Sequence, residues 1–161
     1  MAEKRKILIT GASGLIGGVL REALSERYDL TGIDRRAVPG LTSLTADMID
    51  IEAILPAFEG VDTVIDLAAF APFEAPWDII RDNNIPSTYN SLEAARRAGA
   101  RRLVFASSNH VTGFYGQDER IDAHDMKRPD GYYGLSKSYG EDMAQFYFTP
   151  TLVDTGSDLV L

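Results

Sequence analysis

The segment Gly11-Ala12-Ser13-Gly14-Leu15-Ile16-Gly17 decides the fold of this chain. It follows an apolar run at residues 7–10 that predicts a buried β-strand, and it leads into a stretch, residues 15–24, with apolar residues at helical spacing. Glycines permit a tight turn and let the backbone approach a pyrophosphate, whose charge the N-terminus of the helix stabilises. A strand, a glycine-rich turn and a helix start in this order therefore predict a dinucleotide-binding site.

Apolar runs and helical patterns alternate along the rest of the chain. Pro86 is expected to kink one helical stretch or to start a new helix, and Gly99 to end it. The alternation predicts an α/β fold with a Rossmann-like, doubly wound parallel sheet in three α/β/α layers. Strands are expected at residues 28–34, 44–47, 61–67 and 103–106, and helices at residues 51–58, 77–98 and 132–148.

Composition limits the possible partners of the protein. The 161 residues fit one domain, and a net charge of −8 argues against a nucleic-acid partner. No apolar run approaches the ~20 residues of a membrane span, so no membrane partner is expected. Residues 1–6 leave no room for a signal peptide before the first strand, which favours a cytoplasmic location. Cysteine is absent and the two histidines lie far apart, so no metal site is expected.

A second group of polar residues lies in the last predicted helix. Tyr133 and Lys137 are four residues apart and therefore share one helical face. An ammonium group near a tyrosine stabilises the phenolate and lowers its pKa from the usual ~10. We therefore expect Tyr133 to act as a base that takes a proton from a substrate hydroxyl while hydride passes to the cofactor. The alternative is an ordinary Tyr–Lys pair on a helix surface.

Polar residues also follow the strand predicted at residues 103–106. Ser107, Ser108, Asn109 and His110 come directly after it, at the carboxyl edge where open α/β sheets bind ligands. The hydroxyl of Ser108 is expected to orient the reacting oxygen of the substrate. The alternative is that this hydroxyl caps the strand end or a turn.

The choice of cofactor depends on Asp34, the last residue of the second predicted strand. A carboxylate at this place can accept hydrogen bonds from ribose hydroxyls and repels a 2′-phosphate, so it favours NAD over NADP. Arg35 and Arg36 follow immediately and would weaken that preference.

Taken in order over residues 6–148, these motifs resemble the extended short-chain dehydrogenases/reductases of the NAD-dependent epimerase/dehydratase type. The resemblance implies that Lys137 also holds the nicotinamide ribose and that Asn84 supports the cofactor and a proton relay. It implies a homodimer formed through residues 77–98 and 132–148. The NAD site that it implies comprises Gly11, Ser13, Gly14, Leu15, Ile16, Gly17, Asp34, Arg35, Asp47, Met48, Leu67, Ala68, Ala69, Asn84, Tyr133 and Lys137.

Within that family, the chain is most similar to uronate dehydrogenases. The segments that carry this likeness are residues 105–110, 113–115 and 128–131. It implies oxidation of a hexuronate at its anomeric carbon to an aldarolactone, with Ser108, Asn109 and His110 as substrate contacts. Two alternatives stay open: a nucleotide-sugar epimerase or dehydratase with the same residues, and an NAD-binding module without turnover.

The chain departs from the family pattern at three places. Asp66 stands where relatives usually have histidine, and residues 70–72 replace a loop that carries a hydroxyl in uronate dehydrogenases. The pattern ends at residue 148, so we expect a Rossmann domain over residues 1–148, with the fold truncated after the Tyr–Lys helix, and a tail at residues 149–161 unlike the family. A sixth strand and a substrate lobe are then missing, and a shortened chain is our hypothesis. No arginine follows Arg128, so the tail cannot supply the arginine expected at the sugar carboxylate.

The tail contains a second motif, at residues 152–157. It resembles the active-site turn of aspartic proteases, whose chemistry requires two carboxylates that share a proton. Because the scaffold for such a pair is absent from the sequence, we interpret this motif as a coincidence.

Overall fold

The computed structural model describes residues 4–72, 74–148 and 158–160. Its centre is a parallel sheet with the strand order β3-β2-β1-β4-β5-β6, which confirms the predicted doubly wound fold. The strands are β1 (Lys6–Thr10), β2 (Asp29–Asp34), β3 (Thr42–Thr45), β4 (Thr63–Asp66), β5 (Arg102–Phe105) and β6 (Asp158–Val160). The helices are α1 (Leu15–Leu24), α2 (Ile51–Phe58), α3 (Trp77–Ala98) and α4 (Tyr132–Phe148), with a short 3₁₀-helix, η1 (Asn109–Thr112).

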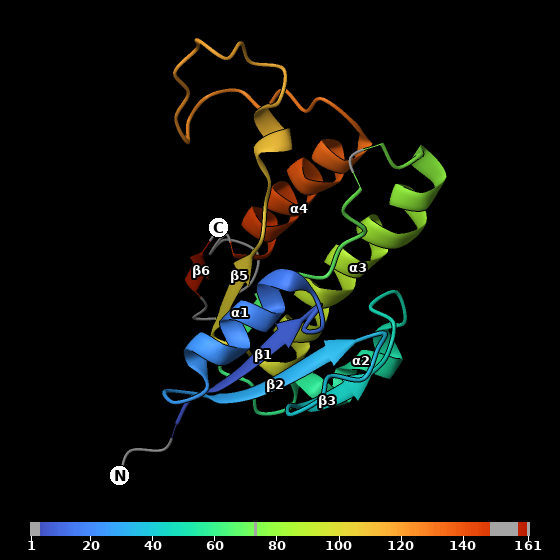
Figure 1. Ribbon diagram of the computed structural model, residues 1–161, viewed down its shortest axis with the longest axis vertical. Coiled ribbons are helices and arrows are strands. Elements are labelled where there is room, and N and C mark those ends of the chain that lie inside the picture. Colours follow the sequence, from blue (N-terminus) through green and yellow to red (C-terminus); the bar gives the residue numbers. More distant parts are fainter. Residues whose placement is uncertain (1–3, 73, 149–157, 161) are drawn as a thin grey trace.

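The helices lie on both faces of the sheet (Figure 1). Helix α1 covers one face, where Ile7, Ile9, Ala12 and Val38 form a small apolar cluster. Helices α2, α3 and α4 lie on the other face, over the larger core around Leu8, Val64 and Leu103. The strand order reverses direction between β1 and β4. In an open parallel sheet, such a reversal leaves a crevice at the carboxyl ends of the strands, where ligands bind.

One predicted strand boundary was wrong, and one of the two alternatives predicted at Pro86 was not found. The third strand spans Thr42–Thr45, not residues 44–47, because its register with β2 places Thr42 opposite Thr31. Helix α3 continues through Pro86, with no new helix start, and ends as predicted at Gly99, whose φ is 69°. Residue 86 would otherwise bond to the carbonyl of Asp82, an exposed residue at which water can replace the missing N–H.

The expected end of the fold at residue 148 also needs correction. Residues 158–160, which we assigned to a tail, form β6 and pair in parallel with β5, with Arg102 opposite Asp158. The physical reason is that β5 would otherwise leave an open edge, where a further strand can satisfy its backbone groups. The protease-like motif at residues 152–157 lies outside the described residues.

A cluster of ion pairs and hydrogen bonds joins α3 to α4. Glu93 accepts two hydrogen bonds from Arg96 and one from Arg97, all at 2.8 Å. Tyr147 of α4 donates its hydroxyl hydrogen to Glu93 Oε2 at 3.1 Å. The Arg96 hydrogen bonds, with those from Arg97 and Tyr147, outweigh the effect of burial and lower the pKa of Glu93 to about 2. The cluster therefore stabilises the packing of these helices while Glu93 is ionised.

Replacing Glu93 with glutamine is expected to lower the free energy of unfolding by about 2 kcal/mol at neutral pH. Since folding lowers the pKa of Glu93, its contribution is complete above about pH 4.5 and is lost as the pH falls toward 2. Urea unfolding of both proteins at neutral and acidic pH measures this difference. Glu52 is the matched control, because it also pairs with Arg97 but its side chain is 78% exposed. Glu52→Gln should change stability by less than about 0.5 kcal/mol, and equal losses in the two variants would contradict the prediction.

Candidate active site

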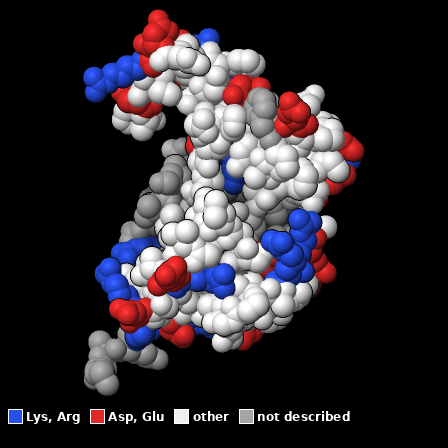
Figure 2. All heavy atoms as spheres, in the orientation of Figure 1, with Lys and Arg blue, Asp and Glu red and all other residues white. Residues whose placement is uncertain are grey.

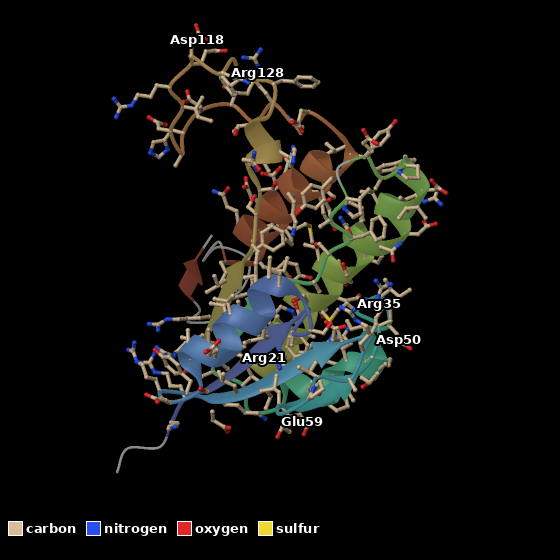
Figure 3. The ribbon with its side chains drawn as sticks, viewed as in Figure 1. Arg21, Arg35, Asp50, Glu59, Asp118 and Arg128 are labelled. Atoms are coloured by element: carbon tan, nitrogen blue, oxygen red, sulfur yellow. The ribbon has the colours of Figure 1, made fainter. Side chains whose placement is uncertain are left out.

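A cavity of about 540 Å³ lies at the carboxyl ends of β1, β2 and β4, where the strand order reverses. Arg35, which lines the cavity, is labelled in Figure 3. Most of the predicted cofactor residues line the cavity: Gly11, Ser13, Gly14, Asp34, Arg35, Asp47, Met48, Leu67, Ala68, Ala69 and Asn84. Arg36, Ala46, Ile49, Phe70, Asn83 and Ser87 also line it. The sequence reasoning did not assign these six to the site, although each is close in the chain to a predicted residue.

The glycine turn forms one wall of this cavity. Gly11 has a φ of 64°, and a Cβ there would lie 3.1 Å from the backbone nitrogen of Ala68. A Cβ on Gly17 would lie 2.8 Å from the carbonyl oxygens of Gly11 and Ala12. The turn is closed by the N–H of Gly14, which donates to Gly11 O at 3.0 Å. The backbone thus fills the space that side chains would need, which leaves a cradle suited to a phosphate at the start of α1.

Asp34 holds the same turn from β2. Its carboxylate accepts hydrogen bonds from the backbone N–H groups of Ser13 at 2.9 Å and Arg36 at 3.1 Å. The Arg36 guanidinium donates to Ser13 Oγ at 2.8 Å. Burial by itself raises the pKa of Asp34, but the hydrogen bonds from Ser13 and Arg36 and the charge of Arg36 hold it below its usual value. Asp34 is therefore an anion at the place where the ribose of a dinucleotide would lie.

Thr10 and Asp66 support the opposite wall, and the sequence reasoning missed this role of Thr10. The Thr10 hydroxyl donates to Asp66 Oδ1 at 2.5 Å and accepts from the N–H groups of Leu67 and Ala68 at 3.1 Å. Asp66 is buried, and burial raises its pKa despite the hydrogen bond from Thr10 and the charge of Lys137. The position of Thr10 at the carboxyl end of β1 was the available signal. The pair fixes the segment 67–69 against the glycine turn.

Asn84 links the cavity to α4. Its amide oxygen accepts from Phe70 N at 2.7 Å, and its amide nitrogen donates to Phe70 O and to Ser136 Oγ, both at 3.1 Å. Ser136 in turn donates to the carbonyl oxygen of Tyr133 at 2.7 Å. A continuous set of hydrogen bonds therefore runs from the loop after β4 to the first turn of α4.

Ser108 and Tyr133 meet at the carboxyl end of β5. The Ser108 hydroxyl accepts from His110 N at 3.2 Å, so it caps η1, as the alternative interpretation held. Ser108 also lies near enough to the Tyr133 side chain to affect its pKa. Burial raises the pKa of Tyr133, and Ser108 lowers it by less. The two residues therefore combine a positioned hydroxyl with a phenol at one place.

Lys137, which we expect to lower the pKa of Tyr133, lies close to both Tyr133 and the end of β5. Its ammonium donates to Ala106 O at 2.7 Å and lies 4.7 Å from the centre of the Phe105 ring, but 5.9 Å from that of Tyr133. Lys137 is only 4% exposed, and burial lowers its own pKa while the charge of Asp66 raises it. The ammonium is thus bonded to the residue after β5 and lies over the rings of both Phe105 and Tyr133.

The remaining predicted residues do not line the cavity. Leu15, Ile16 and Gly17 follow the turn in α1 without lining the cavity, and Leu15 is 88% exposed. Asn109 and His110 lie in η1, with the His110 ring 5.9 Å from that of Tyr133. The structure therefore forms two adjoining regions, the cavity itself and the group Ser108, Asn109, His110, Tyr133 and Lys137.

Three further findings concern a membrane span, a metal site and the position of Arg128. Within residues 4–72, 74–148 and 158–160, no helix is long and apolar enough to cross a membrane. The same residues contain no group of histidines and carboxylates placed to hold a metal ion. Arg128 lies in the projecting loop of residues 113–131, with its guanidinium 4.5 Å from the centre of the Tyr115 ring (Figure 3).

The chain is similar to known proteins over most of its length. A sequence model of the NAD dependent epimerase/dehydratase family matches residues 7–149. The chain is 44% identical to the uronate dehydrogenase of Pseudomonas putida over 94% of its length, and 42% identical over 88% to the L-arabinose 1-dehydrogenase (NAD(P)(+)) of Haloferax volcanii. A crystal structure of mutant Agrobacterium tumefaciens uronate dehydrogenase with NAD superposes with a TM-score of 0.85, at 36% identity over 96% of this chain. The chain spans 59%, 61% and 58% of these three relatives, respectively.

Proposed function

The chain belongs to the NAD dependent epimerase/dehydratase family, and from this we propose that it binds NAD in the cavity and oxidises a sugar, specifically a hexuronate, by hydride transfer. The observation that carries the proposal is a cavity formed by a glycine turn and joined to Tyr133 by hydrogen bonds through Asn84 and Ser136. The solved relative with NAD and the likeness to uronate dehydrogenases support it.

The cavity fits NAD in shape and charge. Gly11 and Gly14 line the cavity at the start of α1, where a pyrophosphate would bind, and the absence of a Cβ at Gly11 and Gly17 lets the turn pack closely on the neighbouring backbone. Asp34 would accept hydrogen bonds from the adenosine ribose, with Arg35 beside it, and Asp47 and Met48 would contact the adenine. The segment 67–69 and Asn84 would enclose the rest of the dinucleotide.

The residues beyond the cavity would carry out the proton transfer. When bound, NAD supplies the acceptor for hydride from the sugar carbon. Tyr133 would take the hydroxyl proton from that carbon, while Ser108 holds the reacting oxygen. Because burial raises the pKa of free Tyr133, the phenolate needs a nearby positive charge. Lys137, already buried beside it, would supply this charge after moving from Ala106 O toward the ribose and the phenol.

The hexuronate is proposed from the likeness to uronate dehydrogenases and from the residues at β5. Asn109 and His110 lie beside Ser108, so they can contact sugar groups near the reacting carbon. A neutral aldose is the second candidate, because the chain is almost as similar to an L-arabinose dehydrogenase. Arg128 would not grip the sugar carboxylate, since it lies in the projecting loop against Tyr115.

NADH formation from NAD with glucuronate, galacturonate, L-arabinose and glucose, followed by absorbance, tests this proposal. Net NADH with a hexuronate and much less with the neutral sugars is expected. An epimerase would return the hydride and show no net NADH, although it would interconvert nucleotide sugars. NAD binding by calorimetry without either activity would show a cofactor-binding module and would contradict the proposed oxidation.

The preference for NAD is expected to depend on Asp34. Replacing it with serine removes the acceptor for the ribose hydroxyls and the charge that repels a 2′-phosphate. We expect NAD to bind about tenfold more weakly and the ratio of NAD to NADP affinity to fall by at least that factor. Asp29→Ser is the matched control, because it removes a carboxylate from the other, exposed end of β2. An unchanged ratio in Asp34→Ser, measured by calorimetry, would place the ribose elsewhere.

We also propose that the protein forms a homodimer through α3 and α4. The two helices pack against each other, and they present exposed aromatic and apolar residues, among them Tyr89 and Phe146. Sedimentation analysis of the parent protein and of a Tyr89→Glu, Phe146→Glu double variant tests this. A monomeric parent would refute it.

A further inference from the structure

His110 has an ionisable partner that the sequence reasoning did not find. Its Nδ1 atom lies 3.0 Å from Oδ2 and 3.1 Å from Oδ1 of Asp130, the carboxylate two residues before α4. The two side chains are 29% and 18% exposed, respectively, so solvent reaches this pair only in part. The pair brings together residues 20 positions apart, at the junction of η1 and α4.

The backbone around the pair limits its freedom. Asp130 N donates to the carbonyl oxygen of His110 at 3.3 Å, and Arg128 N donates to that of Val111 at 2.9 Å. These bonds fix the base of the loop 113–131, which projects from the body above a recess (Figure 2). Asp130 is therefore held at the fixed end of this loop rather than in its projecting part.

Two glycines show that the space around the pair is filled. A Cβ added to Gly113 would overlap the carboxylate of Asp130. A Cβ added to Gly134, in the first turn of α4, would overlap the backbone carbonyl of His110. Any residue larger than glycine at position 113 or 134 would therefore displace Asp130 or His110.

The contact also determines which ring nitrogen carries the proton. An ionised carboxylate can only accept, so Nδ1 of His110 is the donor, and in the neutral ring Nε2 is then the acceptor. The ring meets that of Tyr133 edge-on, with centres 5.9 Å apart and planes at 76°. We propose that Asp130 is a positioning residue, which holds His110 as its Nδ1–H tautomer and in this orientation beside Tyr133. Only one consequence of this inference rests on the proposed function: His110 then meets the sugar in a single tautomer and orientation.

Nitrogen NMR of the imidazole tests the tautomer without any turnover. Spectra are recorded at about pH 8.5, about two units above the ordinary imidazole pKa. His124, the other histidine of the chain, is replaced by glutamine in every sample. We expect protonated Nδ1 in the parent, loss of this preference in Asp130→Ala, and a weaker preference in the similarly sized Asp130→Asn, whose neutral amide oxygen is the poorer acceptor. An Nε2–H tautomer in the parent, or an unchanged tautomer in both variants, would overturn the proposal.

Kinetics separate positioning from a purely structural role. Asp130→Asn should lower kcat/KM for the hexuronate about tenfold and leave NAD affinity unchanged. In a His110→Ala background the same substitution should have no further effect, because Asp130 acts through His110. A second tenfold loss in that background would overturn the proposal. Asp118→Asn, in the exposed part of the same loop (Figure 3), is the control and should leave kcat/KM unchanged. A parent without turnover would contradict the proposed function, whereas the NMR result would still decide the tautomer.

Discussion

Replacing Tyr133 with phenylalanine is expected to lower kcat between about a hundredfold and ten-thousandfold, the range for loss of a positioned general base. Phenylalanine keeps the ring, and therefore the edge-on contact with His110, but it removes the hydroxyl that Ser108 influences. Because Tyr133 does not line the cavity, NAD affinity should change little. Steady-state NADH formation and calorimetry with NAD measure the two quantities on the same preparation.

Tyr132→Phe is the matched control for this substitution. Tyr132 precedes Tyr133 in the first turn of α4, but its ring packs against Trp77, 5.6 Å away between centres, and it is half exposed. The same loss of a hydroxyl at this position should leave kcat within about twofold, as is usual for a surface substitution. Similar losses in the two variants would show that Tyr133 acts through the stability of α4 rather than as the base.

Replacing Gly17 with alanine is expected to abolish detectable NAD binding and to destabilise the fold by about 3 kcal/mol. The added Cβ would lie 2.8 Å from the carbonyl oxygens of Gly11 and Ala12, which belong to backbone rather than to a flexible side chain. Relief of this contact must move the turn or the start of α1, and overpacking of this kind costs about 1–3 kcal/mol. Movement of the turn also removes the cradle for the pyrophosphate. Urea unfolding and calorimetry with NAD check both effects.

Gly18 offers the opposite expectation one residue further along. A Cβ there would meet only the end of the Arg21 side chain, at 3.9 Å, so it fits without movement. Gly18→Ala should therefore stabilise the protein by about 0.5–1 kcal/mol, because alanine is the better residue inside a helix. If Gly17→Ala behaved like Gly18→Ala, the close approach of α1 to the turn would not determine binding.

The sequence predicted the parts of this protein that depend on local pattern. The spacing of apolar residues identified α2, α3 and α4, and the order of strand, glycine turn and helix predicted both the sheet and its cavity. These predictions succeed because hydrophobic periodicity and the steric freedom of glycine act within a few residues. Periodicity was less informative at Pro86, where packing of the rest of α3 maintains the helix despite one missing hydrogen bond.

Tertiary structure alone decided the pairing of side chains that are distant in the chain. Thr10 meets Asp66 and His110 meets Asp130 only because parallel strands and α4 bring their ends to one edge of the sheet. The raised pKa of Tyr133 is also a tertiary property, since it depends on burial and on the nearby Ser108. The sequence by itself determined which residues are candidates for cofactor binding and for proton transfer. The fold determined their protonation and contacts, because burial and distance exist only after the chain has packed.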